Sequence, residues 1–534
     1  MNTPQKLFAS AVLSFLILFS SCSKSDNQKQ DSGSLKPVQG GTMIIGLNSD
    51  VDTFNPLFAE SVNAQEILHL MLLGLADLNA DGDFEPELAE SCKHSDDYLK
   101  LTYFLRKDAL WSDGQPVTAA DVKFTFDLLM DDETASPRQG TTEFIKNVKI
   151  IDSHTVKFEF TEAYPAQIFD TAGEILPKHI LDKAAPKALR GHDFGRNPIS
   201  SGPFKLTKWA NQQFIELAVN EKYFAARPYL DKVIFKIVPD QTSLLMQLEA
   251  GEVDMMMGVP PAEISRIKNK GGIDVHQVSG RLYYFIGYNN KNELFADVNV
   301  RRALTMAVDR NKIIEALLYG YGSKCLGPLP PIVKWAYNDQ TEEIPFDINL
   351  AKEVLAKSGW TDTNNNGTID KDGKEFEFTL IAAAGHQLDS DLTVVIQDYL
   401  SKAGVKVNIE MLEWTNFLDH LQGHSFEACL NALSSSYYID PTPVFHSTAV
   451  NLFNAVSYAN KDVDKLIEAG RQEMDRQKAA EIWKEFQQKV YYDQPYTFLF
   501  WLDKAAGINS SFHNVTPAAI SSLYNIEKWW KQKE

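Results

Sequence analysis

No apolar run in this sequence is long enough to cross a bilayer as a helix. The longest, residues 7–19, holds about 13 residues, whereas a membrane-spanning helix needs about 20. Cysteine is scarce too, with four in 534 residues, which excludes a disulfide-stabilised scaffold. None of the four forms the CxxC pair typical of a zinc site. We therefore expect neither a transmembrane domain nor a zinc centre.

Basic residues are in short supply: 52 Lys and Arg against 71 Asp and Glu give a net charge of −19 and a pI near 5.1. Nucleic-acid binding needs basic patches that neutralise phosphates, so we exclude a nucleic-acid partner. The chain is 44% hydrophobic and 11% aromatic, which is typical of a globular protein and too apolar for disorder. At roughly 150 residues per domain, the length predicts about three domains.

The common catalytic motifs are absent as well. The sequence has no GxxxxGK[ST] phosphate loop, no HExxH zinc pair and no GxGxxG turn. The nearest approach to a nucleophile elbow is residues 423–427, where Glu427 replaces the second glycine and blocks the sharp turn. Adjacent acids at 96–97 and 131–133 lie in polar turns and indicate solvated surface. No motif supports an enzyme, and we predict a non-enzymatic function.

The N-terminus has the pattern of an export signal. One lysine, Lys6, precedes the apolar run, which ends in the small residues Ser20, Ser21 and Cys22. The segment 19–22 resembles a bacterial lipobox, in which the cysteine is lipidated; the alternative is a plain secretory signal with an incidental cysteine. Residues 23–41 are polar and behave as a flexible leash. We predict a signal peptide over 1–21 and a lipidated tether over 22–40, and loss of Lys6 makes the mature net charge −20.

Three cysteines then remain in an oxidising compartment, Cys92, Cys325 and Cys429. An odd number permits at most one disulfide within the chain. Cys325 and Cys429 both fall in the second half of the chain, and we expect these two to pair.

Hydrophobic periodicity predicts mixed α/β lobes. Apolar residues alternate over 43–47, 101–105, 156–160, 214–219 and 233–238, which indicates strands. Thr118 and Asp121 form a capping box before a helical stripe that ends at Met130. In the second half, a strand over 376–380, a helix over 392–400 and a strand over 405–411 form a βαβ crossover, which implies parallel strands. A helix or helix pair spans 462–491, and a strand follows over 496–502.

Residues 362–370 match the first nine positions of a calcium loop. Oxygen ligands occupy positions 1, 3, 5 and 9, a glycine occupies position 6, and a backbone carbonyl is available at position 7. Position 12 is Gly373 instead of the bidentate glutamate. The alternative is a hydrophilic connection whose Asn and Gly residues supply positive φ. No cofactor is required by either interpretation; the candidate ligands are Asp362, Asn364, Asn366, Thr368 and Asp370.

The order of motifs resembles the bacterial extracellular solute-binding proteins of the peptide/nickel class, family 5, the receptors of ABC importers. The most specific stretch is residues 104–124, which is close to the signature of that family. The resemblance covers roughly residues 40–525. Further matches in the same order are Asp52–Pro56, Leu176–His179, Ser201–Phe204, Leu248–Asp254, Asp297–Leu304, Asp309–Arg310, Gly359–Trp360 and Asp440–Pro441.

This resemblance implies an α/β fold, a two-lobed periplasmic-binding-protein-like clamp with an inserted domain. We place the first lobe at 41–75, 190–286 and 505–534, the inserted domain at 76–189 and the second lobe at 287–504. Hinge crossings near 286 and 504 would let the lobes close on a ligand. The implied protein is a monomer of the cell envelope, lipid-anchored to the membrane and exposed to the periplasm or cell exterior. Its partners would be an ABC permease and a separate ATPase subunit.

The ligand segments depart from the family pattern. Peptide binders hold the α-ammonium with an aspartate, but the matching stretch here, 433–437, has neither an acid nor a tryptophan. The loop 383–386 is apolar except for His386. Asp440 could substitute, although we expect it to cap the Pro441 turn. An ammonium buried without a carboxylate is costly, so the sequence favours a neutral or anionic ligand, such as a blocked peptide or an oligosaccharide.

We predict a receptor for peptides or peptide-like solutes. The alternatives are a receptor for an oligosaccharide or a metal chelate, held through an arginine such as Arg138, and an envelope enzyme or scaffold uncoupled from transport. Lone histidines argue against direct nickel binding. Some of the candidate contacts could instead be core residues, because Tyr and Trp are usually largely buried. The candidate contacts are Phe54, Asn55, Tyr283, His386, Trp414, Tyr437, Tyr438, Asp440 and Trp501.

Overall fold

The structure is a computed structural model that describes residues 36–451 and 453–532, and residues 38–534 form one compact unit. The predicted signal peptide and Cys22 lie outside the described residues. Among the helices within 36–451 and 453–532, none is both long and apolar enough to cross a membrane.

One sheet of 11 strands runs through the unit, in the order β17-β16-β18-β12-β19-β11-β1-β10-β9-β8, with β13 paired to β19. At its first-lobe end, β1 is parallel to β10 and β11, and β8, β9 and β10 are antiparallel. Met43, Ile45 and Leu47 of β1 are buried, so the predicted alternation is confirmed. The bounds are β1 (Thr42–Leu47), β8 (Phe204–Ala210), β9 (Phe214–Val219), β10 (Lys232–Ile237), β11 (Met255–Met256), α1 (Val62–Leu68), α5 (Gln241–Ala250) and α6 (Pro261–Lys270).

A separate four-stranded antiparallel sheet, β4-β5-β7-β6, forms within residues 89–160. Helix α2 packs against it, and its N-cap is Thr118, whose predicted capping box with Asp121 is present. Phe126 of α2 and Phe158 of β7 meet edge to face with ring centroids 4.8 Å apart. The bounds are β2 (Ala76–Leu78), β3 (Phe84–Pro86), β4 (Ala89–His94), β5 (Lys100–Leu105), β6 (Ile145–Asp152), β7 (Thr155–Phe160), α2 (Ala119–Met130), α3 (Gln167–Thr171) and α4 (Lys178–Leu181).

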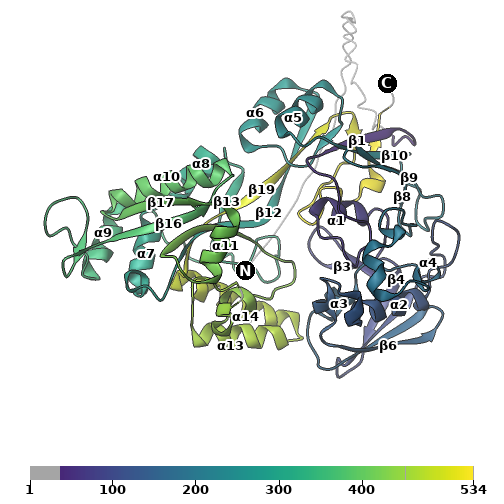
Figure 1. The fold of residues 1–534 in the computed structure, drawn as a ribbon, viewed down its shortest axis with the longest axis horizontal. Helices are drawn as coiled ribbons and strands as arrows, with labels where there is room; N and C mark the ends of the chain where they lie inside the picture. The colour runs from purple at the N-terminus through teal and green to yellow at the C-terminus, as the bar shows by residue number, and fades with distance from the viewer. Residues whose placement is uncertain (1–35, 452, 533–534) are drawn as a thin grey trace, which may run out of the picture. The chain divides into compact units, whose positions relative to one another are not determined.

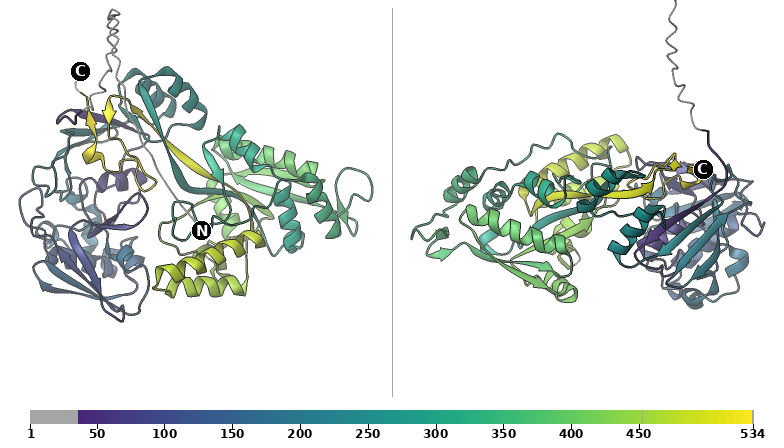
Figure 2. Two further views of the ribbon diagram at one scale, coloured as in Figure 1. Left: turned by 180° about the vertical axis from the view of Figure 1, so that it is seen from behind. Right: turned by 90° about the horizontal axis from the view of Figure 1, so that it is seen from above.

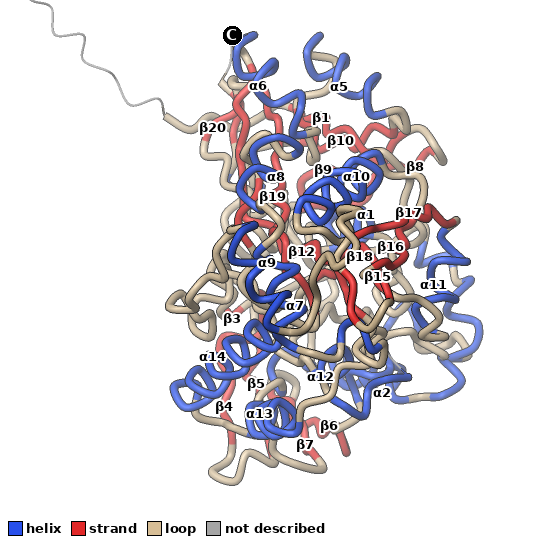
Figure 3. The backbone as a smooth tube through the Cα atoms, turned by 90° about the vertical axis from the view of Figure 1, so that its left-hand side faces the viewer, coloured by secondary structure: helices blue, strands red, loops and turns tan. Residues whose placement is uncertain are grey.

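The second lobe contains the predicted βαβ crossover. Strand β16 is parallel to β17, with Leu380 opposite Ile409, and helix α10 connects them. The long helical segment is a pair, α13 and α14, which lie side by side (Figure 3). The bounds are β13 (Gly322–Lys324), β14 (Asp370–Lys371), β15 (Lys374–Glu375), β16 (Glu377–Ala383), β17 (Lys406–Leu412), β18 (Ala428–Ser434), α7 (Val298–Met306), α8 (Arg310–Leu317), α9 (Ile348–Lys357), α10 (Gln387–Lys402), α11 (Trp414–Gln422), α12 (Thr442–Phe445), α13 (Lys461–Gln472) and α14 (Arg476–Asp493).

Two long antiparallel strands, β12 (Ile273–Tyr288) and β19 (Tyr496–Asn509), join the lobes. Figures 1 and 2 show them running side by side between the two groups of elements. Their register is broken between Val278 and Leu282, which pair with Lys504 and Leu502. Three residues of β12 therefore oppose one of β19, which is a β-bulge. A small hairpin of β20 (Phe512–His513) and β21 (Trp530–Lys531) ends the fold.

The predicted disulfide is wrong. Within the described residues, Cys325 and Cys429 are free thiols, although both are buried in one hydrophobic core cluster. The Cys325 Sγ donates a hydrogen bond to the Gly327 carbonyl at 3.1 Å. The Cys429 Sγ packs against Gly287, where an added Cβ would lie 3.0 Å away from it. Sharing a core does not align two thiols for bonding, because a disulfide needs a specific Cβ geometry.

We expect a maleimide to label Cys92 in the native protein and the other two thiols only after unfolding. Burial raises the pKa of all three thiols, that of Cys429 to about 12, but Cys92 is exposed to the reagent whereas Cys325 and Cys429 are buried. Thiolates are the reactive species. Mass spectrometry of the full chain carrying Cys22→Ser would count the labels with and without urea. Two unreactive thiols after unfolding without reductant would instead show a disulfide.

Candidate ligand-binding site

A cavity of about 420 Å³ opens between the β2–β3 hairpin with α3 on one side and second-lobe loops with α14 on the other. We call it the aromatic cavity. Its volume falls within the range of roughly 300–1,000 Å³ that small-molecule sites occupy. Its aromatic walls are Phe84, Tyr98, Phe169, Trp335, Tyr437, Tyr438 and Trp483, and its polar residues include Asp83, His94, Glu473 and Arg476.

Tyr437 and Tyr438 both contact residues on the hairpin side of this cavity. Tyr438 stacks on Phe169 of α3, with ring centroids 5.6 Å apart. Tyr437 packs against the second-lobe core and meets the hairpin at Gly82, where a Cβ would lie 2.7 Å from its ring. Burial raises the pKa of both phenols to about 12. Both tyrosines are therefore neutral and present apolar faces with a hydrogen-bonding tip.

Two ion pairs bridge the tip of the β2–β3 hairpin to the second lobe. Lys334 pairs with Asp81, and Arg476 pairs with Asp83. The Arg476 guanidinium also lies over the Trp335 ring, 5.1 Å from its centroid. Exposed pairs of this kind contribute about 0–1 kcal/mol each, so they act as a weak electrostatic contact at the mouth of the cavity.

We expect the double variant Asp81→Asn, Asp83→Asn to loosen this contact without unfolding the protein. Hydrogen–deuterium exchange should become faster in the hairpin, residues 76–86, by about two- to fivefold, and raised salt should produce the same change in the wild type. Asp398→Asn is the matched control, because Asp398 pairs with Lys402 on the outer face of α10. Unchanged hairpin exchange would contradict a role for the ion pairs.

A second cavity of about 270 Å³ adjoins the first, and Leu78, Phe84 and Phe169 line both. We call it the acidic cavity, because four carboxylates line it: Asp77, Glu87, Asp170 and Glu174. Burial raises the pKa of Glu87 well above its usual range, with a further contribution from Asp77, and burial raises that of Asp170 to about 6.

The pKa of Glu174 is shifted in the opposite direction. Burial alone would raise its pKa, but Arg138 and His69 outweigh that effect and lower the pKa to about 2. The Arg138 Nη1 donates to Glu174 at 2.9 Å and to the Pro56 carbonyl at 3.2 Å. Arg138, the residue suggested for holding a metal chelate, is therefore already engaged with a carboxylate.

Residues 83–452 match the model of a protein family described as "Bacterial extracellular solute-binding proteins, family 5 Middle". The chain belongs to this family. The oligopeptide-binding protein AppA of Bacillus subtilis is 33% identical over 539 residues, which span 99% of this chain and 98% of that protein. The resemblance inferred from the motif order is thus confirmed.

Solved structures of relatives share the fold of this family member. AppA of Bacillus subtilis in complex with a nonapeptide is 32% identical, with a TM-score of 0.74 and coverage of 93% of this chain and 100% of that chain. NikZ of Campylobacter jejuni in complex with Ni(L-His) is 26% identical, with a TM-score of 0.75 and coverage of 92% and 99%. The two-lobed α/β clamp is therefore the fold of this solute-binding protein.

Four of the predicted contacts lie in the core of this family member instead of on a cavity. Phe54 is fully buried and packs on Trp209, with ring centroids 4.9 Å apart. The buried Asn55 amide donates to the Leu189 carbonyl and accepts from the Leu57 N–H, so it holds its own loop together. Tyr283 and Trp501 form a cross-strand pair, with ring centroids 5.0 Å apart, in the second-lobe core. The structure places these four side chains in the interior, and their role as ligand contacts stays a prediction.

The remaining predicted contacts are distributed around the second lobe. Asp440 accepts from the Thr442 N–H at 3.0 Å and pairs with Arg471 at 3.6 Å, so it caps the turn as expected and already has a cationic partner. His386 precedes α10 and Trp414 begins α11, directly after the paired strands β16 and β17. Trp414 is 55% exposed. Of the nine candidates, only Tyr437 and Tyr438 line the aromatic cavity.

The β2–β3 hairpin was not predicted, although the sequence carries a signal for it. Asp81-Gly82 lies between the apolar residues Leu78 and Phe84, and a DG pair flanked by apolar residues is typical of a hairpin turn. Gly82 has a φ of +80°, a conformation that favours glycine. Arg476 and Trp335 had no such signal, because they meet the hairpin only through the tertiary fold.

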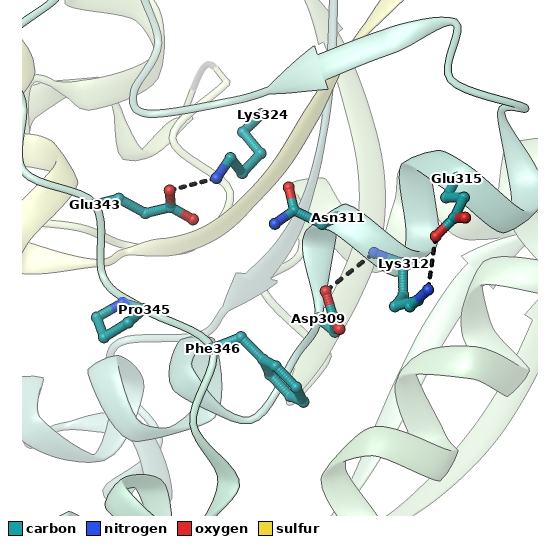
Figure 4. A pocket seen from close by; sticks show the side chains of 8 residues that line it. All are labelled: Asp309, Asn311, Lys312, Glu315, Lys324, Glu343, Pro345 and Phe346. Atoms are coloured by element: carbon teal, nitrogen blue, oxygen red, sulfur yellow. Dashed lines mark hydrogen bonds and ion pairs between the residues drawn. The ribbon is translucent and has the colours of Figure 1, made fainter.

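A wide groove on the second lobe, beside α8, is a different kind of surface (Figure 4). Its charged residues pair with each other: Lys312 with Glu315 at 2.7 Å, and Lys324 with Glu343. Glu343 also holds the buried Arg310 at 2.9 Å. These charges compensate each other within the groove.

The predicted calcium loop, residues 362–370, lies in the connection from α9 to β16, which also contains the β14–β15 hairpin. Asp362 accepts backbone N–H bonds from Asn366 and Gly367 at 3.1 and 3.0 Å. Asp370 is buried and accepts from the Thr363 N–H and hydroxyl at 2.8–2.9 Å. Gly367 and Gly373 have φ of +90° and +75°, as the alternative interpretation expected. Across the described residues, no group of three His, Cys, Asp or Glu side chains is arranged to hold a metal. Calcium binding stays a prediction.

Proposed function

We propose that this protein is the substrate-binding receptor of an ABC importer that captures peptides or peptide-like solutes. The observation that carries the proposal is the aromatic cavity, which Tyr437 and Tyr438 of the second lobe share with Phe84 and Phe169 of the hairpin side. Aromatic walls bind varied side chains through broad apolar contact. Membership in the solute-binding family and the likeness to a nonapeptide complex support the same function.

The finer steps of this proposal follow from the family. The lobes rotate about β12 and β19, the solute is enclosed, and the closed form delivers it to a permease with a separate ATPase. Cys22 carries the lipid that anchors the monomer to a membrane of the cell envelope, facing the periplasm or the exterior. The protein releases its solute chemically unchanged and is not an enzyme.

Native mass spectrometry and calorimetry of the purified full chain test this proposal. A peptide or peptide-like solute should bind at one site per chain, without covalent attachment, and be recovered intact after unfolding. A panel of peptides, N-blocked peptides, oligosaccharides and nickel chelates in a thermal-shift assay would identify the class. Chemical turnover of the bound solute would contradict the receptor, and stabilisation by oligosaccharides or chelates alone would contradict the peptide assignment.

We also propose that residues 362–370 bind a structural calcium ion, because the order of oxygen-bearing residues fits the first nine positions of a calcium loop. Calcium should then raise the unfolding midpoint of the wild type by a few degrees, and Asp362→Asn should remove that shift. Magnesium is the control ion. Equal effects of the two ions, or no effect of either, would contradict a calcium site.

A further inference from the structure

Arg281 lies at the bulge where β12 passes from one lobe to the other. Its backbone carbonyl accepts from the Ser435 N–H at 2.8 Å, and its Nη1 donates to the Ser435 carbonyl at 2.9 Å. Its guanidinium is 5.1 Å from the centroid of the Tyr437 ring. Arg281 does not itself line the aromatic cavity, but it contacts Tyr437, which does, and Arg281 is partly exposed.

The guanidinium of Arg281 has unused hydrogen-bonding capacity. Arginine offers five N–H donors, and in the part of the chain that the structure describes a single side-chain hydrogen bond is made, to Ser435. No carboxylate there lies within ion-pair distance of it, whereas Arg138, Arg310 and Arg476 each pair with an acid. By contrast Arg301, which also lacks an ion pair in this range, donates to the carbonyls of several residues.

The segment after β18 that contacts Arg281 is neutral, and Asp503 of β19, opposite the bulge, already accepts from the Gln277 amide at 2.6 Å. Residues 433–437 contribute an aliphatic side chain, three serines and a tyrosine, so the position at which peptide binders place an acid carries a cation nearby instead. The Tyr437 hydroxyl adds a second donor, since it is buried and has no hydrogen-bond partner among residues 36–451 and 453–532. A buried hydroxyl without a partner is costly, and an acceptor on the solute would remove that cost.

We infer that Arg281 and Tyr437 bind an anionic group of the solute, a carboxylate, beside the wall of the aromatic cavity that Tyr437 forms. Guanidinium and carboxylate match in a planar, two-bonded geometry, and such charge-assisted bonds are stronger than neutral ones. Ser435 and Tyr437 hold the guanidinium in place through the hydrogen bond and the ring contact. The inference rests on the proposed receptor function and names a chemical requirement of its solute.

Calorimetry on the full chain at pH 7 tests this with N-acetylated synthetic nonapeptides that have neutral side chains, prepared either as the free acid or as the C-terminal amide. We expect the wild type to bind the acid at least about tenfold more tightly than the amide. Arg281→Gln should lower the affinity for the acid peptide about tenfold and leave the affinity for the amide peptide unchanged, so that the preference for the acid disappears. Arg281→Lys should retain part of it, and Tyr437→Phe should lower it by a smaller factor. A third peptide, an amide with one glutamate side chain, separates the two sources of carboxylate: binding as tight as the acid shows that a side chain suffices.

Arg266→Gln is the matched control, since Arg266 pairs with Glu249 and Glu263 on α6 and should leave both affinities unchanged. Equal binding of acid and amide by the wild type would overturn the inference while leaving the peptide receptor intact. Equal weakening of both peptides by Arg281→Gln would also overturn it, because it would show that Arg281 only supports β18. Failure of the wild type to bind any of the peptides would overturn the proposed peptide function and this inference together.

Discussion

Replacing Gly280 with alanine should destabilise the protein and abolish solute binding. Gly280 lies in the bulge of β12, where a Cβ would be 1.7 Å from the Leu502 carbonyl oxygen and 2.9 Å from its carbon. Both contacts are with the backbone of β19, so no side chain can move aside. Overpacking of this kind typically costs about 1–3 kcal/mol, and a backbone clash lies at or above the upper end of that range.

The loss of binding has a separate cause, because Gly280 precedes Arg281 and lies between the two lobes. A shift of β12 at this point moves the guanidinium and alters the path about which the lobes rotate. Thermal unfolding and calorimetry with the identified solute measure the two effects. Gly191→Ala is the control, since nothing lies within 4 Å of an added Cβ there and the change should stay within about 0.5 kcal/mol. A Gly280→Ala protein with unaltered unfolding and binding would show that the strands separate easily at the bulge.

The sequence placed hinge crossings near 286 and 504, and the register break lies at 278–282 opposite 502–504. Both crossings were implied by the family resemblance and stay predictions, although the end of the apolar run at Asp503 and Lys504 coincides with the register break on β19. The register break on β12 has no comparable signal in the sequence. Strand β12 is one element of 16 residues whose burial is irregular in its first half and nearly continuous in its second. No single hydrophobic period describes a strand that leaves one lobe and enters the core of another.

The βαβ crossover and the capping box of α2 were predictable because each depends on residues close in sequence. The candidate ligand-binding site was harder to predict. Phe54 and Tyr437 are both aromatic residues in loops, yet one is fully buried and the other lines a cavity, and local pattern does not distinguish these outcomes. The ion pairs of the hairpin join residues 253 and 393 positions apart. Such contacts arise from the tertiary fold and leave no periodic signal in the chain.

Replacing Arg138 with glutamine should lower the free energy of unfolding by about 2 kcal/mol at pH 7. Removing one partner of a buried ion pair typically costs about 3–5 kcal/mol, because a charge stays buried without compensation. The Glu174 side chain is 10% exposed, but Arg138 is 40% exposed, so water and the nearby His69, at 3.5 Å, recover part of that loss. Arg138→Lys should cost less, and the double variant Arg138→Gln, Glu174→Gln should regain most of the stability.

The pH dependence separates charge from packing in this experiment. The pKa of Glu174 is about 2 in the folded protein and 4.5 when unperturbed, so the unfolded chain takes up the proton first as the pH falls. Its contribution to stability is complete above pH 4.5 and disappears as the pH falls toward 2. The difference between wild type and Arg138→Gln should therefore be largest at pH 6–7 and shrink steadily between pH 4.5 and pH 3, as measured by thermal unfolding. Other carboxylates titrate in the same range, but they are common to both proteins and cancel in the difference. A stability difference between the two proteins that does not change with pH would contradict this prediction. It would mean that Arg138 stabilises the fold through its hydrogen bond to Pro56 and its packing, and that the charge of Glu174 makes no contribution.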